Sequence, residues 1–109
     1  MQNALKAKPA AFYTKKNAEL VTVGNLEDNM DWLSEVDWIV EVVVENLKIK
    51  QQVFKNIEKY RKDDTIVSSN TSGIPLKAMV EGLSQGMREH FLITHFFNPV
   101  RYMYLLELV

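Results

Sequence analysis

The sequence predicts an α/β fold in which helices flank a mostly parallel sheet. Short apolar segments rich in β-branched residues alternate with segments of helical periodicity, which indicates βαβ units with right-handed crossovers. Residues 38–44 form a nearly continuous apolar run, as is typical of a strand buried on both faces of a parallel sheet. With 109 residues, 47% of them hydrophobic and 25% charged, the chain has the size and composition of one globular domain or less.

The chain is expected to begin with a connector or partial helix over residues 1–18, where lysines give a mild basic bias, so that the domain covers residues 19–109. A short β-branched segment predicts a strand over 20–23. Asn25 can then cap a helix over 25–35, whose first turn is acidic.

Strand 38–44 contains one charged residue, Glu41, which is expected to be structural and paired inside the sheet. Asn46 can cap the next helix, predicted over 47–60. The predicted inner stripe of that helix consists of Ile49, Val53, Ile57 and Tyr60, with Phe54 beside them.

Three further strands are predicted, over 65–69, 90–96 and 104–109, with a short helix after Pro75. The chain stops inside the last apolar strand pattern, so we expect it to be a fragment. An uncovered sheet edge and apolar surface tend to pair with another copy, which favours a homo-oligomer.

Composition excludes several classes of protein. Lys+Arg 13 against Asp+Glu 14 gives a net charge of -1, which argues against a nucleic-acid binder. Cys 0 excludes a disulfide scaffold, a thiolate metal site and a cysteine nucleophile, and no metal site is predicted. The sequence shows neither an apolar stretch of membrane-spanning length nor a signal peptide, and we expect a cytoplasmic protein with no membrane span.

Polar side chains follow three of the predicted strands. They are Glu45 with Asn46, Asn70 with Thr71 and Ser72, and His95 with Asn98. In open α/β sheets ligands bind beyond the carboxyl ends of the strands, so these side chains define the candidate site. Asn70 and Ser72 can donate hydrogen bonds to a substrate oxygen, although the same residue types are common in plain turns.

His95 is the histidine that lies inside an apolar run, and an imidazole can act as a general base near neutral pH. Glu107 follows twelve residues later in the last strand. If the two strands are neighbours, the carboxylate can orient the imidazole; the alternative is a core histidine and an outward-facing glutamate. The four glycines, at 24, 73, 82 and 86, do not form the G-x-G-x-x-G pattern of a pyrophosphate-binding turn.

Three stretches resemble, in order and spacing, the NAD-binding domain of (3S)-3-hydroxyacyl-CoA dehydrogenases. They are residues 37–50 (DWIVEVVVENLKIK), residues 68–72 (SSNTS), and residues 95–100 (HFFNPV) followed by 105–109 (LLELV). The match runs from about Gly24 to Val109. Within the family, the residues of these stretches are most similar to those of the large bacterial enzymes of fatty-acid oxidation.

The resemblance implies a Rossmann-like fold truncated at both ends, with the first strand, the glycine-rich turn and the C-terminal helical domain missing. It implies that His95 is the catalytic base, that Glu107 orients and charge-balances His95, and that Ser72 binds the substrate oxygen. The positions that it places at the dinucleotide cleft are Glu45, Lys50, Asn70 and Asn98.

The implied reaction is oxidation of (3S)-3-hydroxyacyl-CoA to 3-oxoacyl-CoA in fatty-acid β-oxidation, with NAD as cofactor and acyl-CoA as the partner of the full-length enzyme. The fragment alone is expected to be inactive, because it lacks the pyrophosphate anchor. Two alternatives are a noncatalytic, crystallin-like structural relative and a bare α/β interaction module.

Overall fold

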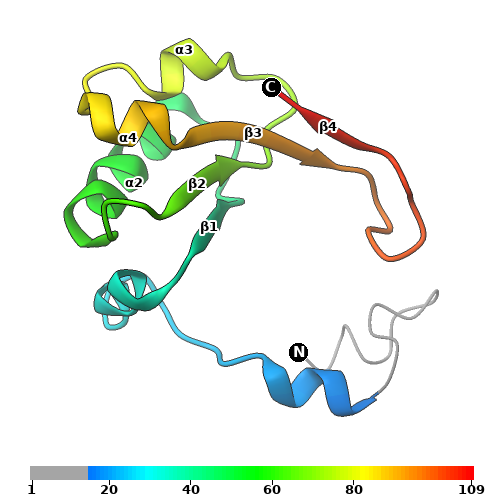
Figure 1. Cartoon of the computed structure of the whole chain (residues 1–109). Helices are drawn as coiled ribbons and strands as arrows, with labels where there is room; N and C mark the ends of the chain where they lie inside the picture. Colours follow the sequence, from blue (N-terminus) through cyan, green and yellow to red (C-terminus); the bar gives the residue numbers. More distant parts are fainter. Residues whose placement is uncertain (1–14) are drawn as a thin grey trace.

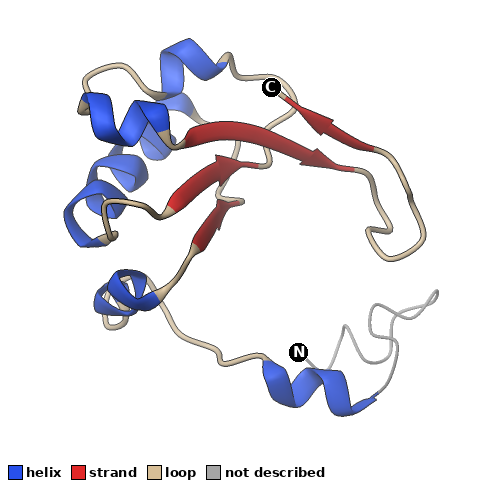
Figure 2. Ribbon diagram, in the orientation of Figure 1, coloured by secondary structure: helices blue, strands red, loops and turns tan. Residues whose placement is uncertain are grey.

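The computed structural model describes residues 15–109, without the side chains of residues 15, 17 and 18, so the expected connector over 1–18 lies largely outside the described residues. The chain forms a sheet with helices along one face (Figure 1) (Figure 2). In chain order, the elements are the 3-10 helices η1 (Lys15–Leu20) and η2 (Met30–Glu35), β1 (Trp38–Glu41), α2 (Leu47–Tyr60), β2 (Ile66–Ser69), α3 (Leu76–Met79), α4 (Gln85–Glu89), β3 (Phe91–Phe96) and β4 (Leu106–Leu108).

The sheet has the strand order β1-β2-β3-β4. The pairs β1–β2 and β2–β3 are parallel, and β4 is antiparallel to β3. The prediction of a mostly parallel sheet with flanking helices is therefore confirmed. Because β1, β2 and β3 are parallel, their carboxyl ends lie at one edge of the sheet, which is where the polar residues follow them.

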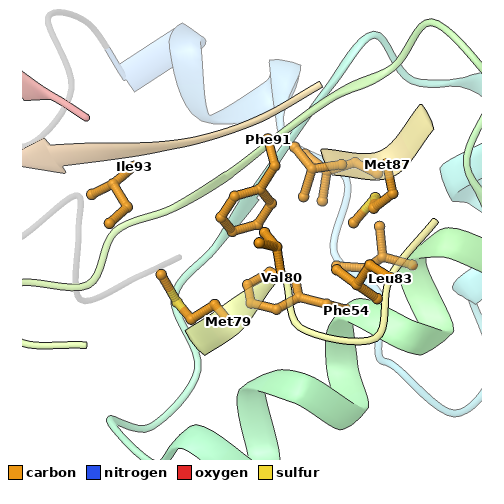
Figure 3. Packing of buried hydrophobic residues seen from close by; sticks show 10 residues of the cluster. Phe54, Met79, Val80, Leu83, Met87, Phe91 and Ile93 are labelled. Atoms are coloured by element: carbon orange, nitrogen blue, oxygen red, sulfur yellow. The ribbon is translucent and has the colours of Figure 1, made fainter. Parts of the chain in front are cut away.

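The hydrophobic core lies between the sheet and the helices α2, α3 and α4 (Figure 3). Phe54 of α2 is fully buried and meets Phe91 of β3 edge to face, with ring centroids 4.9 Å apart. Helix α2 begins as predicted, because the side-chain Oδ1 of Asn46 accepts a hydrogen bond from the backbone N–H of Ile49 at 3.1 Å.

The buried face of α2 differs from the predicted stripe. Phe54 and Ile57 are buried, but Ile49 and Tyr60 are exposed, and the inward position one turn before Phe54 belongs to Lys50. The buried residues Lys50, Phe54 and Ile57 are spaced i, i+4 and i+7, which is one helical face. A lysine can take a buried position only where its charge is paired, as it is here.

The predicted strand over 20–23 and helix over 25–35 are wrong. Residues 21–25 carry no helix or strand, and only η2 is helical within 25–35. Strand 20–23 fails because no described strand lies beside it to supply ladder hydrogen bonds. The Asn25 side chain does make the predicted capping contacts, since its Oδ1 accepts from the N–H groups of Glu27 (2.9 Å) and Asp28 (2.7 Å). Only a single turn follows, which the Asn29 side chain closes by accepting from the Asn25 N–H at 3.0 Å, and η2 begins after it.

The expected burial of residues 38–44 on both faces is also wrong. Strand β1 forms one edge of the described sheet and ends at Glu41, and its side chains alternate between exposed and buried. Ile39 belongs to the core beneath α2, whereas Trp38 (49%) and Val40 (38%) remain exposed on the opposite face, where no described helix packs. The strand ends at Glu41 because its side-chain Oε2 accepts from the N–H of Val43 at 2.7 Å, which turns the chain.

Candidate active site

A small cavity of about 120 Å³ lies at the carboxyl edge of the sheet. Its lining residues come from the loop after β2, from β3 and from β4, and they are Thr71, Ser72, Ile74, Ile93, His95, Glu107 and Val109. The cavity therefore brings together Ser72, His95 and Glu107, the three residues for which the resemblance implies catalytic roles.

His95 and Glu107 lie directly opposite each other in the antiparallel pair β3–β4. The Nδ1 of His95 is 2.9 Å from Oε1 of Glu107. The contact that the spacing left open and the resemblance implies is thus present, and the two side chains point to the same face of the sheet. An ionised carboxylate only accepts hydrogen bonds, so Glu107 holds a proton on Nδ1.

The other nitrogen of the His95 ring, Nε2, makes no hydrogen bond to any residue among 15–109. The side chain of His95 is 25% exposed and that of Glu107 is 56% exposed, so water screens their attraction in part. The Phe97 ring lies against the imidazole, with centroids 5.0 Å apart, and restricts its rotation. Nε2 is therefore the ring nitrogen that remains open to another group.

Ser72 stands in the turn after β2, and the turn is anchored to Glu45. The hydroxyl of Thr71 donates to Oε1 of Glu45 at 2.5 Å, and the Ser72 N–H lies 3.4 Å from Oε2. The Thr71 hydroxyl is the main reason why the pKa of Glu45 is lowered; desolvation opposes this shift, and the Ser72 N–H and the Lys50 ammonium make smaller contributions in the same direction as Thr71. Glu45 is therefore ionised at neutral pH and can tether the turn.

Lys50 is buried and does not line the cavity. Its Nζ lies 2.6 Å from Oε2 of Glu41, 3.2 Å from the carbonyl oxygen of Val43 and 3.5 Å from Oε1 of Glu45. Glu41 is thus paired inside the protein, as expected. The structure places Lys50 beneath Glu45, and its assignment to the cofactor cleft stays a prediction.

The two predicted asparagines have different surroundings. The Oδ1 of Asn70 accepts from the N–H of Phe96 at 3.1 Å, which ties the end of β2 to β3 beside His95. Asn98 lies in the exposed loop after β3, before a cis peptide bond to Pro99, and it does not line the cavity.

Among residues 15–109 no cluster of potential metal ligands occurs, and none of the helices is long and apolar enough to cross a membrane.

Known proteins resemble this chain along its whole length. Residues 1–109 match the family described as 3-hydroxyacyl-CoA dehydrogenase, NAD binding domain. A Bacillus subtilis (strain 168) protein named "Probable 3-hydroxyacyl-CoA dehydrogenase" is 52% identical over 109 residues, which are 100% of this chain and 14% of that protein. The fatty acid oxidation complex subunit alpha of Ectopseudomonas oleovorans is 45% identical over 76 residues, which are 70% of this chain and 10% of that subunit.

The fold also matches a solved structure. The (S)-3-hydroxybutyryl-CoA dehydrogenase PaaH1 from Ralstonia eutropha aligns with a TM-score of 0.67 at 34% sequence identity, covering 73% of this chain and 28% of that enzyme. The fold and these matches define a Rossmann-like dinucleotide-binding domain of dehydrogenase type. The chain belongs to the family of NAD-binding domains of 3-hydroxyacyl-CoA dehydrogenases. It spans much less than half the length of these relatives.

Proposed function

We propose that the protein carrying this chain oxidises (3S)-3-hydroxyacyl-CoA to 3-oxoacyl-CoA with NAD in fatty-acid β-oxidation. The observation that carries the proposal is the contact between His95 and Glu107 at a cavity that Ser72 also lines. Oxidation of a secondary alcohol needs a base at the hydroxyl and an acceptor for the hydride that leaves the same carbon.

The chain's own residues handle the proton in this proposal. Nε2 of His95 takes the proton from the 3-hydroxyl, while Glu107 stabilises the imidazolium that forms and keeps Nε2 turned to the cavity. The hydroxyl of Ser72, which makes no hydrogen bond within the described chain, donates to the substrate oxygen. His95 then releases the proton to water, so the alcohol has lost one hydride and one proton.

The residues present fit the nicotinamide nucleoside half of the dinucleotide. The carboxyl edge of the sheet carries the carboxamide of Asn70 and the carboxylate of Glu45, which suit the amide and ribose hydroxyls of a nicotinamide nucleoside. These 109 residues contain no glycine-rich turn that suits the pyrophosphate. When bound, NAD supplies the acceptor for the hydride that leaves C3 of the substrate.

The enantiomers of the substrate provide the test. We expect the whole protein to form NADH, followed by its absorbance, from (3S)-3-hydroxybutyryl-CoA and not from the (3R) enantiomer, because base and hydride acceptor are held on fixed sides of the reacting carbon. No NADH from the (3S) substrate, or equal rates from both enantiomers, would contradict the proposal.

Two further parts of the proposal concern the whole protein. We propose a homo-oligomer, supported by the exposed apolar face around Trp38 and Val40, and sedimentation as a monomer at high concentration would contradict it. We also propose that the protein is cytoplasmic, which cell fractionation tests.

A further inference from the structure

A buried network of charged and hydroxyl groups lies next to the candidate active site. Its centre is Glu41, 3% exposed, at the end of β1. One carboxylate oxygen accepts from the Ser69 hydroxyl at 2.6 Å. The other oxygen accepts from the Val43 N–H at 2.7 Å and from the Lys50 ammonium at 2.6 Å. Glu41 therefore joins the carboxyl ends of β1 and β2 to the first turn of α2.

Two arms of this network run from Glu41 and meet at Thr71. The shorter arm passes through Ser69, whose hydroxyl oxygen lies 3.4 Å from the Thr71 N–H. The longer arm passes through Lys50, which lies 3.5 Å from Glu45, and Glu45 accepts from the Thr71 hydroxyl. Thr71 is thus held both through its backbone and through its side chain.

Thr71 in turn shapes the part of the loop that reaches the cavity. Its Oγ1 accepts from the Ile74 N–H at 3.2 Å, which closes a turn around Ser72. Thr71, Ser72 and Ile74 all line the cavity with His95. The position of the Ser72 hydroxyl relative to Nε2 of His95 therefore depends on a turn that Glu41 holds from below.

A buried ion pair is an inefficient source of stability, because desolvation of both charges offsets most of their attraction. The pair Glu41–Lys50 instead fixes the positions of the neighbouring polar groups, because each of its hydrogen bonds holds one polar atom in one place. An apolar pair of similar volume could fill the same space and would not hold Ser69 or Glu45.

We propose that Glu41 is a positioning residue, which acts through Ser69, Lys50 and Thr71 to set the place of Ser72 in the active site. The inference rests on the proposed function for its kinetic consequence. Its geometric part, an ordered turn over residues 71–74, does not depend on any substrate.

Glu41→Gln removes the charge at nearly constant volume and is the first variant to test. Asp37→Asn is its matched control, because it makes the same change at the other end of β1, in the exposed ion pair of Asp37 with Lys62 at 2.9 Å. In the whole protein we expect Glu41→Gln to speed amide hydrogen exchange of the peptide covering residues 70–76 about tenfold. We expect kcat to fall about tenfold while KM for acyl-CoA changes little, because a misplaced polar group acts mainly on the transition state.

Thr71 provides the second pair of variants, in case the buried charge left by Glu41→Gln prevents folding. Thr71→Val removes the hydroxyl to which the longer arm leads, and it exposes no buried charge. We expect it to reproduce both effects, and we expect Thr71→Ser, which restores the hydroxyl, to recover kcat and slow exchange. Packing by the Thr71 methyl group alone would not predict this rescue.

The two readouts separate the possible failures. Unchanged exchange of residues 70–76 and unchanged kcat in folded Thr71→Val would overturn the positioning role, as would equal losses in Asp37→Asn and Glu41→Gln. An inactive wild-type protein would overturn the proposed function alone, because the exchange rates are measured without substrate.

Discussion

The charge of Glu107 should contribute a measurable but limited part of catalysis. Glu107→Gln keeps a side-chain oxygen that accepts from Nδ1 of His95, now 2.9 Å from Oε1, and removes only the negative charge. A hydrogen bond to a charged group contributes about 1.5–3 kcal/mol and a neutral one about 0.5–1.5 kcal/mol, so the difference is about 1–1.5 kcal/mol. Both side chains are partly exposed, which favours the lower end of that range.

This free-energy difference corresponds to a fall in kcat of roughly five- to tenfold, at about 1.4 kcal/mol per factor of ten. The assay is steady-state NADH formation from (3S)-3-hydroxybutyryl-CoA by the whole protein. Glu27→Gln, which alters an exposed glutamate in the turn before η2, serves as control. A Glu107→Gln variant as fast as the wild type, or an equal loss in Glu27→Gln, would show that the carboxylate does not stabilise the imidazolium.

Three other substitutions test separate parts of the structure. Phe54→Ala removes a fully buried ring packed on Phe91 and should lower the free energy of unfolding by about 3–5 kcal/mol in urea titrations; a loss under about 1 kcal/mol would contradict the packing. Ser72→Ala should lower kcat/KM up to about tenfold, the equivalent of one hydrogen bond, and an unchanged value would remove Ser72 from the reaction. Because the folded pKa of Glu45 lies below its ordinary value of 4.5, its contribution to stability is present above pH 4.5 and is lost as the pH falls through the lowered value. Thr71→Val should raise that pKa in a carboxyl NMR titration and flatten this acid limb, and an unshifted titration would contradict the assigned cause.

From β1 onward, the order of the strands and of helix α2 could be predicted from the sequence because it depends on local patterns. Helix α2 has a cap, Asn46, and an amphipathic period, and the run that becomes β3 is apolar and bounded by turn residues. The segment over 20–23 has the same local pattern as a strand. Whether such a segment pairs depends on a neighbour in space, which local pattern does not contain.

The burial of β1 and α2 likewise depends on neighbours in space, which the local sequence pattern does not contain. The apolar run over 38–44 was compatible with burial on both faces, but the described chain covers only the face that contains Ile39. The buried Lys50 could have been anticipated, because Lys50, Phe54 and Ile57 share one helical face and Glu41 needs a partner inside the sheet.

The site was predictable where it depended on strand order and register. Strand ends placed Ser72 and His95 at one edge, and the contact of His95 with Glu107 required only that β3 and β4 be neighbours. The tether from Glu45 to the turn around Ser72 was not predicted. It joins residues 26 apart through side-chain hydrogen bonds, and no spacing rule indicates such a contact.

The role of His95 as the general base is tested most directly by the rate of hydride transfer in a single turnover. The whole protein, saturated with NAD, is mixed with (3S)-3-hydroxybutyryl-CoA, and NADH formation is followed for the wild type, His95→Gln and the control His90→Gln. His90 lies outside the cavity at the end of α4, so its replacement should leave the rate unchanged. Removal of the base should slow the single turnover of His95→Gln by about 100-fold or more while NADH binding is retained. A His95→Gln variant that transfers hydride at the wild-type rate would contradict the assignment of His95 as the base.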